Sequence, residues 1–273
     1  MRAECQSACA AYALALPSRS FSGRLGERHG RGPGSSVEFV DFRDYAPGDD
    51  VRHVDWRTYA RTDQLKVRLY REEIAPVLDV VLDTSASMGV TAAKAQAAVD
   101  LVHAACEWAS RGGGAARLWA AGGGAIDPAA FERDGVALLA GPPCELWPHA
   151  PLRRCGLRLL VSDFLTPEDP GPAVRRVAAG GSHLYVLQLL DPWELEPISE
   201  GPRTLVDCES KSRLDLVLDR PTVDRYRARL TALRSAVATA VRGAGGTYAC
   251  VRADSPAVMF RADLLRQGVI QPR

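Results

Sequence analysis

Short apolar runs alternate with longer amphipathic segments along most of the chain. The runs have the length and composition of buried strands, and they predict strands at 76–83, 116–121, 156–163, 183–191 and 247–254. The segments between and after them have helical character, which predicts helices at 91–110, 128–140, 171–179, 221–246 and 255–268. Strands alternating with helices predict a doubly wound α/β fold, in which helices cover both faces of a mostly parallel sheet.

Three further segments have the character of exposed or half-buried strands. Residues 65–73 alternate apolar and polar side chains, which is the period of a half-buried edge strand. Residues 204–207 and 213–219 flank the polar segment CESKS. They predict a pair of strands joined by a polar turn.

The region from Gly23 to Arg61 differs from the rest because it is dense in Gly, Arg and Asp. Its acidic and basic residues nearly balance, and five aromatic residues are interleaved with them: Phe39, Phe42, Tyr45, Trp56 and Tyr59. This pattern favours a folded N-terminal charged arm over a disordered linker. A solvated charged face is the alternative.

Within this arm we expect arginine guanidinium groups to form forked hydrogen bonds with nearby carboxylates, and Trp56 to anchor the arm. The residues assigned to the arm's partner-binding or structural role are Arg43, Asp49, Asp50, Arg52, Asp55, Trp56 and Arg61. Two roles stay open for the arm. It is either a brace packed on the edge of the sheet or a docking surface for a partner.

Composition limits the number of domains and the kinds of partner. With 273 residues, of which 47% are hydrophobic, the chain is long enough to bury a substantial core. We expect a helical segment over 1–22, the arm and edge strand over 23–75, and an α/β domain over 76–270. The net charge of +1 argues against a nucleic-acid binder or a membrane-surface binder, because it supplies no excess of Lys and Arg to meet a negative field.

The N-terminus and the cysteines bear on the compartment. The first 20 residues contain an apolar stretch, but Glu4 and Gln6 interrupt its start, which favours a short amphipathic helix over a secretory signal. No segment approaches the ~18 apolar residues that a membrane span needs. The seven cysteines form no CxxC pair, which predicts reduced thiols and no zinc site; they are Cys5, Cys9, Cys106, Cys144, Cys155, Cys208 and Cys250. We therefore expect a soluble, cytoplasmic protein.

Two of the predicted strands end on an aspartate: VLDVVLD ends at Asp83 and LRLLVSD ends at Asp163. The carboxyl ends of parallel strands lie at one edge of the sheet, where ligand sites gather. The two carboxylates are therefore expected to share a crevice. Asp83 also begins the sequence Asp-Thr-Ser-Ala-Ser, which adds the hydroxyl groups of Ser85 and Ser87. Carboxylate and hydroxyl oxygens are ligands that suit Mg²⁺.

Other chemistries fit this turn less well. A serine nucleophile on a strand-to-helix turn is normally flanked by glycines, yet Asp83 and Ser87 stand at those positions. The rival hypothesis of this class is a hydrolase that uses His53 and Asp55 with Ser85. The segments RGGGAAR and AGGGAI lack the Lys-Ser/Thr ending of a phosphate-binding loop. A third alternative is a scaffold in which the serines only cap the following helix.

These residues resemble two known protein groups. The turn DTSASMG, the segment VSDF and the α/β alternation resemble a von Willebrand factor A-type domain and its metal-ion-dependent adhesion site. The string EFVDFRDYAPGDDVRHVDWRTYARTDQLKVRLYREE, from Glu38 to Glu73, is similar to the signature of a bacterial family of unknown function, numbered fifty-eight. Genes of that family often lie beside those of MoxR-type AAA+ ATPases. With the segments LLDPWELE and LVDCES, the likeness covers roughly residues 20–270.

The resemblance implies a von Willebrand factor A-like fold and a binding mechanism that breaks no bond. In such domains a partner's acidic residue fills the open coordination position of the metal. The resemblance thus implies a partner-binding adaptor, not an enzyme. Its implied partners are a MoxR-like ATPase or other von Willebrand A-like proteins, in assembly or maturation of a client complex. The implied ion is Mg²⁺, or Mn²⁺ in its place, held by Asp83, Ser85, Ser87 and Asp163.

Two departures from these groups are visible. The adhesion site normally takes a threonine from a loop between the two aspartate loops, and no threonine occurs between Thr91 and Thr166. This predicts weaker metal binding. Members of the family commonly carry membrane segments before the signature, and the residues before Glu38 contain none, which is the pattern of the short, soluble branch.

Overall fold

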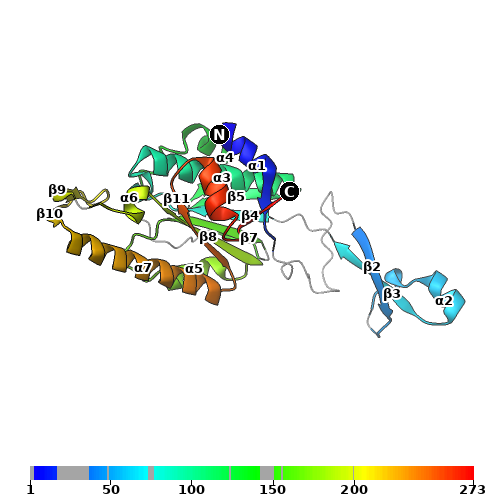
Figure 1. Ribbon diagram of the computed structural model, residues 1–273. Coiled ribbons are helices and arrows are strands. Elements are labelled where there is room, and N and C mark those ends of the chain that lie inside the picture. Colours follow the sequence, from blue (N-terminus) through cyan, green and yellow to red (C-terminus); the bar gives the residue numbers. More distant parts are fainter. Residues whose placement is uncertain are drawn as a thin grey trace. The chain divides into compact units, whose positions relative to one another are not determined.

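The computed structural model describes residues 3–16, 37–47, 49–72, 77–122, 124–141, 151–154, 156–198 and 200–273. It describes only the backbone of residues 3, 37–41 and 68–72. The chain divides into two compact units, and Figure 1 shows both. Unit 1 comprises residues 1–20 and 76–273, and unit 2 comprises residues 21–75.

The centre of unit 1 is a six-stranded sheet with the order β11-β8-β7-β4-β5-β6. Its strands are β4 (Val77–Leu82), β5 (Ala115–Ala120), β6 (Ala125–Ile126), β7 (Leu157–Ser162), β8 (His183–Leu190) and β11 (Thr247–Arg252). All neighbouring strands are parallel except β5 and β6. Every residue of β7 is buried, because helices cover both faces, and a strand buried on both sides reads as a continuous apolar run.

Two layers of helices cover this sheet. Figure 1 shows α3 (Ala92–Arg111) on one face, and α5 (Pro170–Ala178) with α7 (Arg220–Gly243) on the other. Alternate residues of β4 enter different cores: Leu78 and Val80 join the α3 side, and Val81 joins the α5 and α7 side. The predicted α/β class with a mostly parallel sheet between helices is confirmed.

Smaller elements complete unit 1. The helix α1 (Ala3–Ala11) leads into β1 (Tyr12–Leu14), which pairs with β12 (Ile270–Pro272) next to the C-terminus. An antiparallel hairpin is formed by two strands apart from the main sheet; they are β9 (Gly201–Val206) and β10 (Arg213–Leu218). The short helices are α4 (Pro128–Asp134), α6 (Pro192–Leu195) and α8 (Pro256–Val258). A 3-10 turn, Ala86–Gly89, precedes α3.

Two of the predicted helices differ from the observed ones. The helix expected over 128–140 ends at Asp134, and turns continue to Ala140. A Cβ atom at the following Gly135 would lie 2.7 Å from the carbonyl oxygen of Phe131. The helix expected over 255–268 is a single α-helical turn that continues as a π-helix, Met259–Leu264. The periodicity of apolar residues alone does not distinguish an α-helix from a series of turns or from a π-helix.

Unit 2 contains β2 (Val37–Asp44), α2 (Trp56–Thr62) and β3 (Lys66–Glu72). The strand expected at 65–73 is β3. It pairs with β2 in a two-stranded sheet, apart from the described strands of the main sheet. Buried Asp55 begins α2 by accepting a hydrogen bond from the backbone of Arg57, as a helix N-cap does.

Two predicted absences concern the membrane and disulfides. Among the helices that the structure describes, none is long and apolar enough to span a bilayer. Five of the seven cysteines are described, and no disulfide joins them to one another: Cys5, Cys9, Cys106, Cys208 and Cys250. Cys144 and Cys155 lie outside the described residues.

Candidate functional site

The candidate site lies at the carboxyl ends of two adjacent central strands. In the sheet, β4 lies between β5 and β7. The chain runs from β4 outward to β5 and β6 on one side, and then crosses back to form β7 on the other side of β4. In an open α/β sheet, the point where the strand order reverses leaves a crevice outside the strand ends, and ligands bind there. Asp83 directly follows β4 and Asp163 directly follows β7. The two aspartates therefore flank the reversal point.

Asp83 is held in place by the end of β7. Its backbone N–H donates to the carbonyl oxygen of Val161 at 2.9 Å. Its carboxylate accepts from the hydroxyl of Ser162 at 2.7 Å and from the backbone N–H of Ser85 at 3.0 Å. The side chain is 4% exposed. Residues from both strand ends thus orient this carboxylate.

The two serines of the turn bring their hydroxyl groups together. Ser85 Oγ lies 2.9 Å from Ser87 Oγ. Neither serine caps the long helix α3, because its N-cap is Thr91, whose Oγ1 accepts from the backbone N–H of Lys94 at 3.1 Å. Ser85 makes no side-chain capping bond to the 3-10 turn that follows it. Capping, the basis of the scaffold alternative, therefore does not explain the pair of hydroxyl groups.

Two glycines allow the chain to pack closely around this turn. Gly141 donates its N–H to the carbonyl oxygen of Thr84 at 2.9 Å, and a Cβ atom there would lie 2.7 Å from that oxygen. A Cβ atom at Gly89 would lie 2.2 Å from the carbonyl oxygen of Leu139. The segment 139–141 therefore supports the serine turn from the side.

Asp163 is 2% exposed and bonded on both carboxylate oxygens. Oδ1 accepts from the backbone N–H of Leu165 at 2.9 Å, and Oδ2 accepts from Nζ of Lys94 at 2.8 Å. Its backbone carbonyl accepts from Nε2 of Gln188 at 2.8 Å. The next residue, Phe164, has a left-handed φ of 57° and is buried, so packing holds this backbone in an uncommon conformation.

Sequence reasoning did not assign Lys94 to the site. Its side chain is 0% exposed, and Nζ also contacts Oε1 and Oε2 of Glu194 at 2.8 and 2.9 Å. The sequence pattern could have indicated this role. Lys94 shares a helix face with Ala98 and Leu101, both of which are buried, so a charged residue stands on the apolar face of the helix. Lysine is almost never fully buried unless it is paired.

Glu194 and Asp191 connect the site to α6. Asp191 caps α6 by accepting from Trp193, while its own N–H donates to Glu194 Oε2 at 2.7 Å. Oδ2 of Asp191 also accepts from the hydroxyl of Thr91 at 2.7 Å. The starts of α3 and α6 and the end of β7 thus meet in one buried polar network.

Burial and neighbouring charges shift the pKa values of several groups in and near this network. Burial, followed by the negative charge of Asp163, raises the pKa of Asp83. Burial lowers the pKa of Lys94, but the carboxylates of Asp163 and Glu194 outweigh burial, so its net shift is upward and it stays an ammonium ion. Glu209, in the turn of the β9–β10 hairpin, has a pKa raised by burial and by charges that include Asp83 and Asp163. The turn therefore lies within electrostatic reach of the crevice.

The residues present fit a hard divalent cation. Two carboxylates and two hydroxyls are oxygen donors of the type that Mg²⁺ prefers, and the repulsion that raises the pKa of Asp83 is relieved by a cation. Among the described residues, no group of three or more His, Cys, Asp or Glu side chains is arranged to hold a metal. The fit therefore depends on the hydroxyls of Ser85 and Ser87.

The arm residues show two of the expected ion pairs. Arg43 binds Asp49 through two guanidinium nitrogens at 2.7 and 2.6 Å. Arg52 binds the carboxylate of Asp50 with a shortest distance of 2.6 Å. These forks hold the segment between β2 and α2. The pKa values of both carboxyl groups are lowered, chiefly by hydrogen bonds from these arginines.

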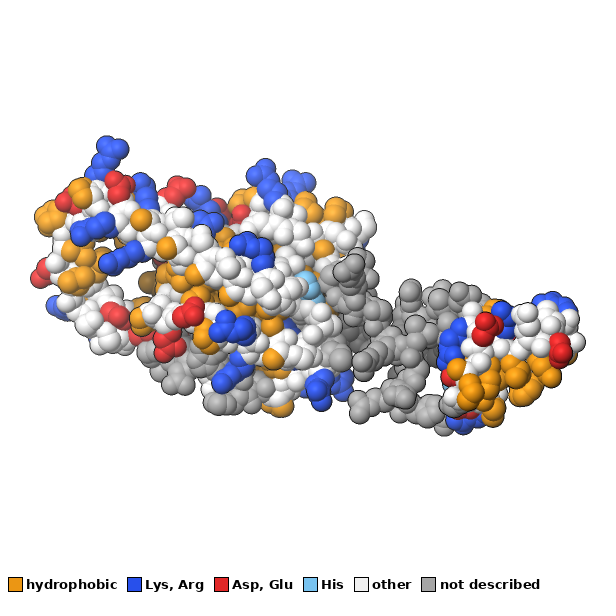
Figure 2. All heavy atoms as spheres, turned by 90° about the horizontal axis from the view of Figure 1, so that it is seen from below, with side chains coloured by type: hydrophobic (Ala, Val, Ile, Leu, Met, Phe, Trp, Pro, Cys, Tyr) orange, Lys and Arg blue, Asp and Glu red, His pale blue; other side chains and the backbone are white. Residues whose placement is uncertain are grey.

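Other arm residues behave differently. Within unit 2, Trp56 is 58% exposed, and it meets Tyr59 edge to face with ring centroids 6.2 Å apart. Arg57 and Arg61 have no carboxylate partner among the described residues. Asp55 caps α2. In Figure 2, hydrophobic side chains gather on one face of unit 2, with basic side chains beside them.

The residues of the hydrolase hypothesis lie in different units. His53 and Asp55 belong to unit 2, whereas Ser85 belongs to unit 1. Asp55 accepts from the hydroxyl of Thr58 at 3.0 Å. Within unit 1, the hydroxyl of Ser85 contacts that of Ser87. Neither unit by itself holds the three residues that this mechanism needs.

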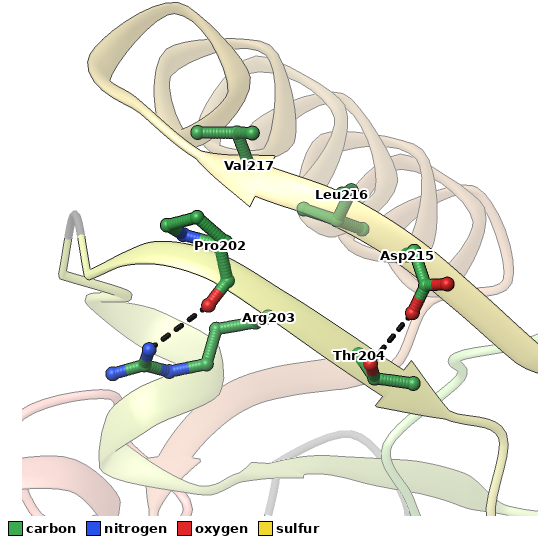
Figure 3. A pocket seen from close by; sticks show the side chains of 6 residues that line it. All are labelled: Pro202, Arg203, Thr204, Asp215, Leu216 and Val217. Atoms are coloured by element: carbon green, nitrogen blue, oxygen red, sulfur yellow. Dashed lines mark hydrogen bonds between the residues drawn. The ribbon is translucent and has the colours of Figure 1, made fainter.

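An open groove of about 400 Å³ lies along the β9–β10 hairpin. Figure 3 shows its lining residues: Pro202, Arg203, Thr204, Asp215, Leu216 and Val217. The hydroxyl of Thr204 donates to Asp215 at 2.6 Å, and Arg203 donates to the carbonyl oxygen of Pro202. The first of these bonds joins the two strands, and the second lies within β9. The groove therefore offers no converging set of free polar groups for a small ligand.

Comparison with known proteins identifies one family over part of the chain. Residues 41–128 match the model of a family described as "Protein of unknown function DUF58". The match includes unit 2 from Asp41 onward, the Asp83 turn and Lys94. Asp163 and Glu194 lie beyond it.

The similar curated proteins are mycobacterial and uncharacterized. "Uncharacterized protein Mb1516" of Mycobacterium bovis and "Uncharacterized protein Rv1480" of Mycobacterium tuberculosis are 30% identical over 116 residues, which is 42% of this chain and 35% of each relative. "Uncharacterized protein MAV169" of Mycobacterium avium is 28% identical over 116 residues, 66% of its length. The matched region spans about a third of the first two relatives. No solved structure matches the chain.

Proposed function

We propose that this protein is a partner-binding adaptor that works with a MoxR-type AAA+ ATPase in assembly or maturation of a client complex. The observation that carries the proposal is the pairing of the Asp83-Ser85-Ser87 turn with Asp163 at the reversal point of the sheet. When the six strands of the main sheet are numbered 1 to 6 along the chain, their order in the sheet is 6-5-4-1-2-3. The third of them, β6, lies at an edge and is antiparallel to β5. The resemblance to a von Willebrand factor A-type domain implies a doubly wound, mostly parallel sheet of this kind. The sheet order therefore supports that finer fold assignment.

The crevice supplies the means of binding. Asp83, Ser85, Ser87 and Asp163 would hold Mg²⁺ or Mn²⁺, which when bound offers an open coordination position to a carboxylate of the partner. The chain fixes these donors before any ion arrives: Ser162 orients Asp83, and Leu165 with Lys94 orients Asp163. Donors that are fixed in advance lose little entropy on binding. The contact of Ser85 with Ser87, rather than with a histidine, favours binding over nucleophilic chemistry.

The α2 helix of unit 2 provides a second candidate contact. Trp56 and Tyr59 lie 6.2 Å apart, and both are exposed on the same side of α2 because they are three residues apart. Arg57 and Arg61, four residues apart, form an adjacent basic stripe. Aromatic and arginine side chains together are typical of the centre of protein interfaces. A partner surface with acidic and aliphatic side chains complements this stripe.

The crevice mechanism is tested by capture of a MoxR-type ATPase from the same genome. Wild type should capture the ATPase or its client in Mg²⁺ and release it on chelation, and Mg²⁺ or Mn²⁺ should raise its Tm. Asp83→Ala should lose both effects. Asp79→Asn is the matched control, because Asp79 is a buried carboxylate on the same strand that binds Arg117 instead. Its Tm should fall while its response to Mg²⁺ persists.

The outcome that contradicts this mechanism is capture that neither chelation nor Asp83→Ala affects. In that case the α2 surface becomes the candidate contact with the ATPase.

A further inference from the structure

Lys94 occupies the surroundings of a bound cation. Its Nζ atom lies within 2.9 Å of three carboxylate oxygens, one from Asp163 and two from Glu194. The lysine side chain is 0% exposed, and the two carboxylate side chains are 3% and 13% exposed. A charge this deeply buried persists only when the groups around it replace its water shell. These carboxylates do so for the ammonium group.

The position of this ammonium group is fixed from three elements. Lys94 stands in the first turn of α3, where its backbone N–H is capped by Thr91. The same Thr91 donates to Asp191, whose N–H donates to Glu194. Asp163 holds the third side from the end of β7. The oxygens around Nζ are thus placed by the fold and not only by the lysine.

The network holds more negative than positive groups. Among the residues that the structure describes, the network contains four carboxylates with little exposure, Asp83, Asp163, Asp191 and Glu194, and one ammonium group, that of Lys94. Lys94 contacts two of them, and Asp83 binds only neutral donors in its described contacts. The side of the network next to Asp83, Ser85 and Ser87 is therefore the side that lacks positive charge.

We infer that this network takes two positive charges, and that Lys94 permanently supplies one by filling a cation position between Asp163 and Glu194. The second position, beside Asp83, Ser85 and Ser87, is left for the divalent ion; this part rests on the proposed function. The two positions share Asp163, so the ammonium repels the ion. Isolated wild-type protein therefore binds the ion weakly.

Mn²⁺ is the probe for the test, with binding counted by electron paramagnetic resonance and calorimetry. Mn²⁺ bound by wild type should be lost in Asp83→Ala and kept in Glu194→Gln. Lys94→Ala removes the ammonium and leaves space for an ion among the same oxygens. It should bind Mn²⁺ at least about tenfold more tightly than wild type. The part of that gain that comes from an ion between Asp163 and Glu194 should disappear in Lys94→Ala/Glu194→Gln.

Two controls distinguish the effect of removing the ammonium charge from the effect of destabilising the fold. Lys94→Met fills the space without a charge and should gain no Mn²⁺ between Asp163 and Glu194. If Lys94→Ala does not fold in metal-free buffer, its refolding in Mn²⁺, followed by circular dichroism, becomes the readout. The inference predicts recovery in Mn²⁺ for Lys94→Ala and none for the double variant.

The results separate this inference from the proposed function. Lys94→Ala that binds Mn²⁺ no more tightly than wild type, or that does not recover in Mn²⁺, overturns the inference while the Asp83-dependent site stands. Wild type that binds no Mn²⁺, together with a Glu194-dependent gain in Lys94→Ala, overturns the metal part of the proposed function. In that case the inference about Lys94 stands.

Discussion

Nζ of Lys94 lies 2.8 Å from Oδ2 of Asp163, and both side chains are buried. The pair joins the first turn of α3 to the end of β7 across the crevice. Glu194 accepts from the same ammonium, and Gln188 binds the backbone carbonyl of Asp163. The loop that carries Asp163 is thus fixed by side chains from α3 and β8, and α6 acts on it through Lys94, independently of any ion.

Lys94→Met should destabilise the folded protein strongly. The change keeps the length of the side chain but leaves two buried carboxylates without their cation, and breaking such a pair typically costs about 3–5 kcal/mol. Urea denaturation at pH 7 in the presence of a chelator measures the loss. Lys66→Met is the matched control, since Lys66 pairs at 3.2 Å with the exposed Asp44, and a surface pair contributes about 0–1 kcal/mol. Equal losses for both variants would contradict the cation role of Lys94.

The metal-free protein should respond to pH through Asp83. Its pKa is raised above the ordinary value of 3.8, first by burial and then by the charge of Asp163. Protonation therefore favours the folded state. The contribution to stability is fully present below pH 3.8 and is lost as the pH rises through the folded-state pKa.

Asp83→Asn mimics the protonated carboxyl group, so it should be more stable than wild type at pH 7 in chelator. That advantage should shrink as the pH falls toward 4. Urea denaturation at several pH values measures the difference. An advantage of the same size at every pH would show that Asp83 is not the titrating group. Asp79→Asn controls for the loss of a buried carboxylate from β4.

Gly89→Ala should disturb the serine turn. Its Cβ atom would lie 2.2 Å from the carbonyl oxygen of Leu139, so the backbone must shift, which typically costs about 1–3 kcal/mol. Gly243→Ala is the control because no atom lies within 4 Å of its Cβ position at the end of α7. Thermal melts should show a lower Tm for the first variant only. An unchanged Tm for Gly89→Ala would mean that segment 139–141 does not support the turn.

Trp56→Ala should weaken capture of the ATPase without loss of stability. The side chain is 58% exposed, so that its removal opens no cavity in unit 2, whereas an aromatic residue at the centre of an interface typically contributes 2 kcal/mol or more, roughly a thirtyfold change in Kd. Trp193→Ala is the control, since Trp193 is an exposed tryptophan of unit 1. Calorimetry with the purified ATPase measures both. Equal affinities for Trp56→Ala and wild type would exclude the α2 surface as the contact.

The central strands and long helices could be predicted because their signal is local. β4, β7 and β8 are buried by helices on both faces, so they appear in the sequence as apolar runs. The strands β1, β6 and β12 have only two or three residues each, which is too short for a period of two to be visible. Their pairing depends on tertiary contacts.

The same difference divides the candidate site. Asp83, Ser85 and Ser87 are neighbours in the chain, so the sequence by itself places them on one turn after a strand. Lys94 lies 69 residues from Asp163 and 100 residues from Glu194. Nothing local in the sequence pairs a lysine with carboxylates so far away. Only the packing of α3 and α6 against the end of β7 decided that this lysine is buried among them, because a buried charge must be met by whichever opposite charges the fold brings close.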